Sequence, residues 1–122
     1  SVAIVEGMTA HLLAAGVPEH DLVHTYNALA GSLVGFVDIE LARPIADADQ
    51  SDDEQRNALR SRVNDSDHPH LSPRFDQFAG QAFSMRWTNG VDRPMDATFD
   101  TLLDILLAGV KARIPNHSRQ RP

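Results

Sequence analysis

The 122-residue sequence contains no cysteine, which excludes disulfide bonds, thiolate metal ligands and cysteine nucleophiles. Basic residues are also scarce: 11 lysines and arginines against 17 acidic residues leave a net charge of −6. Binding to nucleic acid needs clustered positive charge, so we do not expect this polypeptide to bind DNA by itself. No apolar run approaches the roughly 20 residues that cross a bilayer. We therefore expect no membrane association, and the lack of cysteine fits a cytoplasmic protein.

Signatures of catalysis are missing as well. The sequence has neither a glycine-rich phosphate loop nor a Gly-x-Ser-x-Gly turn, and Ser32 lies among apolar residues without a neighbouring base. The run of acidic residues after Ser51 is explained as the first turn of a capped helix. We predict no catalytic residue, no enzyme activity and no cofactor.

Two groups of histidine and acidic residues raise the question of a metal site. His20 and His24 are four residues apart beside Glu19 and Asp21, and residues 65–70 hold two aspartates and two histidines. We interpret the first group as solvated or capping residues near a helix start, and the second as turn residues. Metal binding is the alternative for both groups, and no metal site is predicted.

Apolar residues recur at helical spacing along the chain, and no segment alternates with a period of two, so the predicted fold class is all-α. Gly16, Pro18, Ser51, Ser72-Pro73 and Asp96 mark helix ends or starts. The predicted helices span residues 1–15, 18–42, 52–63, 72–87 and 97–114. The third is short and polar, which suits the rim of the protein. Residues 44–50 form an acidic turn, and residues 115–122 a flexible tail after one domain.

The long second helix and the last helix are each apolar on two sides. In the long helix, large side chains share one face, and small ones, with Ile39, share the nearly opposite face. The last helix repeats this division, with a broad leucine-rich face and a narrower one. A surface helix needs to bury only one face, so a second layer of the same chain or a second copy must cover the other. We predict a homodimer, with intrachain packing as the alternative.

Three motifs then resemble a known family. They are Leu12-Leu13-x-x-Gly16-Val17, Leu33-x-Gly35-Phe36-Val37-x-x-Glu40 and Phe99-x-x-x-Leu103-Asp104-x-Leu106-Leu107-x-Gly109-Val110. In this order they resemble the C-terminal regulatory domain of TetR-type transcriptional repressors, and the likeness covers residues 1–114. The resemblance implies a helical bundle in which the long and final helices form a four-helix dimer interface about a two-fold axis. The expected interface residues are Ala28, Gly31, Gly35, Ile39, Thr101, Ile105, Ala108 and Ala112.

The resemblance also implies a pocket for a small effector between the first helix, the large face of the long helix and the aromatic helix. The expected ligand-binding residues are Met8, Leu12, Tyr26, Leu29, Leu33, Phe36, Phe83 and Trp87. Such apolar walls suit a hydrophobic or aromatic effector, with Thr25, Tyr26 and Asn27 as polar anchors. Ordinary core packing is the alternative for each of these residues.

In such repressors an N-terminal helix-turn-helix domain binds a palindromic operator, and the effector changes the arrangement of the two DNA-reading heads. The sequence carries no such domain, so we expect it to be a fragment with no DNA-binding residues of its own. The alternative is a standalone helical dimeric module for interaction or scaffolding, without an effector.

Overall fold

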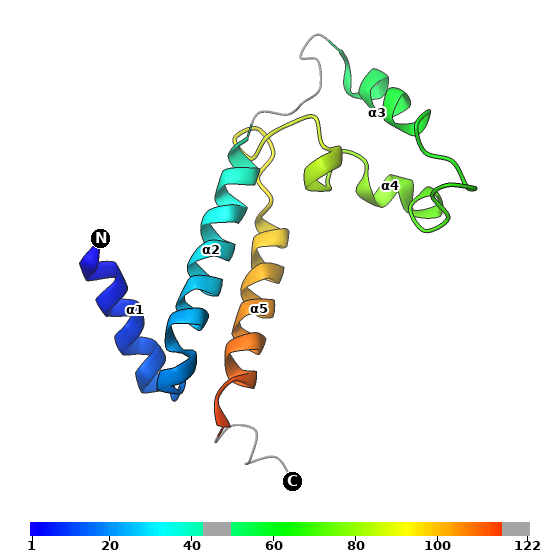
Figure 1. Cartoon of the computed structure of the whole chain (residues 1–122). Helices are drawn as coiled ribbons and strands as arrows, with labels where there is room; N and C mark the ends of the chain where they lie inside the picture. Colours follow the sequence, from blue (N-terminus) through cyan, green and yellow to red (C-terminus); the bar gives the residue numbers. More distant parts are fainter. Residues whose placement is uncertain (43–49, 116–122) are drawn as a thin grey trace. The chain divides into compact units, whose positions relative to one another are not determined.

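The computed structural model of the protein describes residues 1–42 and 50–115 (Figure 1). Every regular element in these two ranges is helical, which confirms the predicted all-α class. The chain divides into two compact units, a first unit of Ser1–Val37 with Asp96–Pro122 and a second unit of Asp38–Met95. The predicted acidic turn, except Gln50, and the predicted tail, except Pro115, lie outside the described residues.

The first unit begins with helix α1, Val2–Ala15, which ends where the sequence predicts. Gly16 adopts a left-handed conformation with φ of 103°, which glycine reaches without a steric penalty. Its N–H donates to the carbonyl of Leu13, and the N–H of Val17 donates to that of Leu12, both at 3.0 Å. These bonds satisfy carbonyls that the helix leaves free at its end. A 3₁₀ turn, Glu19–Asp21, then leads into the long helix α2, Leu22–Leu41.

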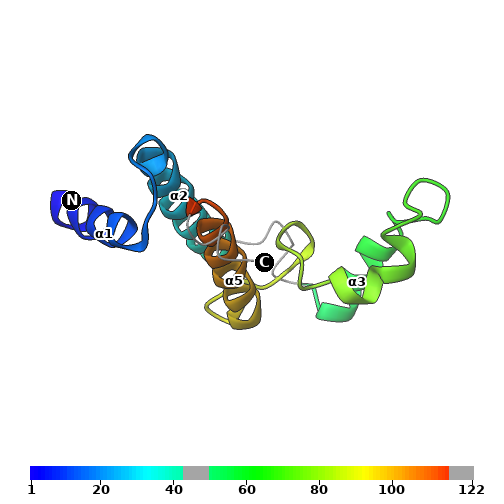
Figure 2. The ribbon, with the colours of Figure 1, turned by 90° about the horizontal axis from the view of Figure 1, so that it is seen from below.

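Helix α2 packs side by side with α5, Asp96–Ala112, as Figures 1 and 2 both show. Asp21 lies 3.2 Å from the guanidinium of Arg113 just beyond one end of the pair. Further along, the rings of Phe36 and Phe99 are 5.4 Å apart and inclined at 56°. The residue just before α2 therefore meets the residue just after α5, a residue late in α2 meets one early in α5, and the two helices run antiparallel.

The core of the first unit is small. Its buried residues are Leu12, Val17, Thr25 and Phe36, and α5 contains no buried residue at all. Large apolar side chains of α5 remain open to solvent, with Ile105 63% and Leu107 59% exposed. Both apolar sides of α5 therefore still carry exposed apolar area in the single chain.

The second unit contains helix α3, Asp52–Arg60, the single turn α4, Phe75–Phe78, and two 3₁₀ turns, Ser72–Arg74 and Phe83–Met85. The hydroxyl of Ser51 accepts from the N–H of Glu54 at 3.2 Å, which confirms the predicted cap of α3. No residue of α3 is buried. Buried Phe75 instead lies beneath the guanidinium groups of Arg56 and Arg60, at 5.5 and 5.1 Å from its ring.

The predicted single helix over residues 72–87 is wrong. Ala79 leaves the helical conformation with ψ of 123°, and Gly80 follows with φ of 78°. The ring of Trp87 packs so closely on Gly80 that an added Cβ would lie 2.9 Å from it. The aromatic residues keep helical spacing in the sequence, but Gly80 turns the chain back so that its N–H bonds to the carbonyl of Met85 at 2.9 Å.

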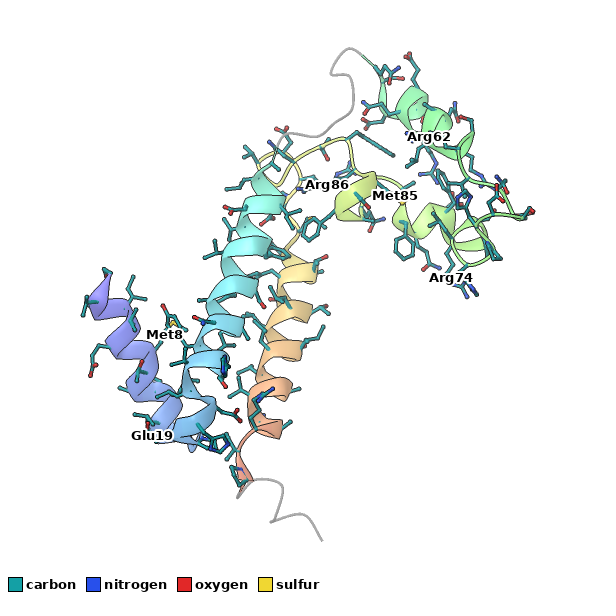
Figure 3. All side chains as sticks on the ribbon, in the orientation of Figure 1. Met8, Glu19, Arg62, Arg74, Met85 and Arg86 are labelled. Carbon is teal, nitrogen blue, oxygen red and sulfur yellow. The ribbon has the colours of Figure 1, made fainter. Side chains whose placement is uncertain are left out.

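The C-terminal end of α2 is held by the segment that precedes α5. The guanidinium of Arg86 donates to the carbonyls of Ile39 and Glu40, the latter at 2.8 Å (Figure 3). The N–H of Gly90 donates to the same Glu40 carbonyl at 2.7 Å, and the Glu40 carboxylate accepts from the N–H of Met95 at 2.9 Å. The bonds to the backbone carbonyls of Ile39 and Glu40 satisfy acceptors that a helix end otherwise leaves to water.

We expect Gly90→Ala to destabilise this contact. An added Cβ would lie 2.2 Å from Cγ of Glu40, whose carboxylate is already committed to Met95. Relief of that overlap should cost about 1–3 kcal/mol of unfolding free energy. Urea unfolding followed by circular dichroism measures the loss. Gly7→Ala is the control, because a Cβ there meets nothing within 4 Å. Equal stability of the two variants would contradict the prediction.

Candidate functional site

The residues predicted to form the dimer interface all lie on α2 and α5. Gly35 is half-buried and the other seven are exposed, with Ile39 46% and Ile105 63% exposed. A Cβ placed on Gly31 or Gly35 would meet nothing within 4 Å. Among the described residues, therefore, nothing packs closely on α2 at these two glycines. The homodimer itself stays a prediction.

A cavity of about 270 Å³ lies between α2 and α5, and we call it the α2–α5 cavity. Half-buried Leu29, Leu106 and Val110 contribute apolar walls. Exposed Ala28 and Ile105 also line it, and both belong to the predicted dimer interface. The cavity therefore adjoins the face where a second copy is predicted to pack.

The polar residues of the α2–α5 cavity are few. Thr25 is 5% exposed, and its hydroxyl has no hydrogen-bond partner among the described residues. His24 and Arg113 also line the cavity, and both are exposed. Arg113 is already paired with Asp21, so its charge is largely compensated. A buried hydroxyl without a partner is costly, and it can bind a polar group that enters the cavity.

The residues predicted to bind the effector are divided between the two units. Met8, Leu12, Tyr26, Leu29, Leu33 and Phe36 lie in the first unit, and Phe83 and Trp87 lie in the second. Leu12 and Phe36 are buried, and the other six are half-buried. Leu29 lines the α2–α5 cavity, Phe36 packs against Phe99, and Trp87 lines a cavity of the second unit.

That second cavity, of about 510 Å³, lies between α3 and the segment around Met85. Gln55 and Arg62 line one side, and Met85 and Trp87 line the other; Figure 3 labels Arg62 and Met85. The side-chain oxygen of Gln55 is buried and has no hydrogen-bond partner within the described ranges. Its amide nitrogen donates to the carbonyl of Gln50 at 2.9 Å, which fixes the orientation of the side chain.

The groups of histidine and acidic residues do not form a metal centre in the described part of the chain, where no three such side chains converge. The turn at residues 64–68 is closed by hydrogen bonds instead. The side chain of Asn64 accepts from the N–H of Asp67 at 2.8 Å, and His68 Nδ1 accepts from the N–H of Asn64 at 3.1 Å. This is the turn chemistry that the sequence predicts.

No helix within residues 1–42 and 50–115 has the length and apolarity needed to cross a bilayer. No family model, curated protein or solved structure matches this chain.

Several residues that line the α2–α5 cavity were not predicted from the sequence to bind the effector. Gly109, Val110 and Arg113 line the α2–α5 cavity, whereas the sequence prediction places the effector between the first helix, the large face of the long helix and the aromatic helix. The signal in the sequence is Gly109 itself, because glycine inside a leucine-rich helix takes the place of a better helix former. Thr25, by contrast, was identified from the sequence as a polar anchor.

Proposed function

We propose that this chain is the effector-sensing and dimerisation domain of a TetR-type transcriptional repressor. Three things support the proposal: the resemblance of the three sequence motifs to that family, the all-helical order of elements, and the antiparallel pairing of α2 with α5. The observation that carries the proposal is the exposed apolar face of this helix pair. This face includes Ile105 of α5, and Gly31 and Gly35 of α2, on which no described residue packs closely.

The physical argument for self-association rests on that face. Exposed isoleucines lose contact with water when a second copy covers them, and each square ångström of apolar area contributes about 25 cal/mol. Gly31 and Gly35 carry no side chain, so the backbone of a second α2 can approach closely. A two-fold axis brings the same face from both copies together and produces a four-helix interface from two helix pairs.

Effector control follows if the ligand binds one arrangement of the dimer better than another. Such a ligand shifts the population towards the favoured arrangement by its differential affinity. In the proposed repressor, the DNA-reading domain lies N-terminal to this sequence, and the shift lowers its affinity for the operator. The chain itself contributes the interface and the ligand site, and no DNA contact.

Sedimentation equilibrium tests the dimer, which should have twice the 13.4 kDa mass of the chain. A thermal-shift screen with aromatic and hydrophobic compounds tests effector binding, because a ligand at a hundredfold excess over its dissociation constant adds about 2.7 kcal/mol. A dimer that no compound stabilises would favour the standalone scaffold module. A monomer at every concentration would contradict both functions.

The transcriptional role needs a separate experiment. The intact mass of the polypeptide made by the source cell should exceed 13.4 kDa through additional N-terminal residues, and that product should bind a palindromic operator. A natural product of 13.4 kDa would contradict the repressor and leave the scaffold function.

A further inference from the structure

We propose that the α2–α5 cavity binds a compact, mostly apolar molecule with one uncharged hydrogen-bonding group, such as a phenol or a bicyclic aromatic alcohol, and that Thr25 receives this group. The proposal deepens the effector sensing proposed above and places the site on the α5 side of α2. All residues that line the cavity come from one chain, so the site itself does not require a dimer.

The hydroxyl of Thr25 is the first part of the argument. Thr25 is 5% exposed, yet its hydroxyl has no hydrogen-bond partner in the described chain. A threonine in a helix can satisfy its hydroxyl with the carbonyl four residues earlier, and Thr25 does not. The hydroxyl can donate and accept a hydrogen bond, so a ligand hydroxyl can bond to it either as acceptor or as donor. Binding would then remove the penalty of a buried unpaired group.

The size and walls of the cavity set the shape of the ligand. Gly109 lines the cavity, and a Cβ added to it would meet nothing within 4 Å. A dry cavity of about 150 Å³ accommodates benzene, so the 270 Å³ here suits about ten to twelve non-hydrogen atoms. Leucine and valine walls favour the apolar body of such a molecule.

The charges near the cavity favour a neutral polar group over a carboxylate. Arg113 is the cation that lines the site, and its guanidinium lies 3.2 Å from the carboxylate of Asp21. An anionic ligand would compete with the Asp21 carboxylate for Arg113. His24 is exposed, so water screens its interaction with a charged ligand group.

The test uses the full 122-residue chain with β-naphthol and its methyl analogue, β-methylnaphthalene, as probes. Titrations followed by amide NMR report both affinity and location. We expect β-naphthol to shift residues 24–29 and 105–113, and Thr25→Val to weaken its binding about threefold to tenfold, the worth of one net hydrogen bond. Thr25→Ser should retain binding, and β-methylnaphthalene should bind wild type and Thr25→Val equally.

Gly109→Leu should abolish binding of both probes because its side chain fills the cavity, while Gly7→Ala in α1 should leave binding unchanged. Shifts confined to other residues, or equal β-naphthol affinity of wild type and Thr25→Val, would overturn the proposal. So would the absence of binding at the solubility limit of both probes. Sedimentation of the same samples tests the ligand site and the proposed dimer separately. A dimer that does not bind β-naphthol would contradict the ligand site alone. A monomer that binds β-naphthol would contradict only the dimer.

Discussion

Ile105→Asp should leave the protein monomeric at concentrations where the wild type is a dimer. Ile105 is 63% exposed on the small face of α5, where the proposed two-fold interface places it near the centre. The axis brings two new carboxylates into that interface without partners. A buried unpaired charge costs several kcal/mol, and a loss of about 4 kcal/mol raises the dissociation constant about a thousandfold. Sedimentation equilibrium over a wide concentration range measures this change.

Leu107→Asp is the matched control for that experiment. Leu107 is 59% exposed on the same helix, but it lies two residues on, which places it on nearly the opposite side of α5. Both side chains already face water in the single chain, so neither substitution should unfold it. If the interface lies elsewhere on the protein, Ile105→Asp will remain dimeric. If the added charge acts only through general repulsion between copies, Ile105→Asp and Leu107→Asp will dissociate to the same extent.

The order of helices could be predicted because local signals agree with it. Gly16 ends α1, Ser51 caps α3, and the apolar periodicity of α2 and α5 continues over many turns. The segment after Ser72 misled the prediction because its aromatic residues keep helical spacing. In the structure the ring of Trp87 packs on Gly80, where the chain leaves the helix. The spacing of the aromatic residues does not predict this contact.

The candidate site was only partly predictable, for a related reason. Helix α2 is apolar on two sides, so the pattern shows that both need cover but not which side receives α5. In the structure the contact combines Phe36 and Leu29 from the large face with Thr25 and Ala28 beside it. The sequence predicted Thr25 as a polar anchor, but it did not predict that residues of α5 would line the same cavity. The contact of Arg86 with the end of α2 joins residues 46 apart or more, beyond any local signal.

Phe36→Ala should cause the largest loss of stability of the substitutions considered. Phe36 is 6% exposed, and its ring meets that of Phe99 where α2 crosses α5. Truncating a buried phenylalanine costs about 3–5 kcal/mol, against a total of about 5–15 kcal/mol for an ordinary domain. Urea unfolding by circular dichroism should show this loss. Val34→Ala, in the same helix but 60% exposed, should change stability by less than about 0.5 kcal/mol.

A comparison with the other end of the helix pair shows which contact holds α2 to α5. The Asp21–Arg113 ion pair is partly exposed, with 24% and 55% of the side chains open to water, so it should contribute less than about 1 kcal/mol. Asp21→Asn should therefore unfold at nearly the wild-type urea concentration, far above Phe36→Ala. The opposite order of midpoints would mean that the ion pair, and not the aromatic contact, fixes the pairing of α2 with α5. Because the proposed ligand site and dimer face both depend on that pairing, Phe36→Ala should also weaken both.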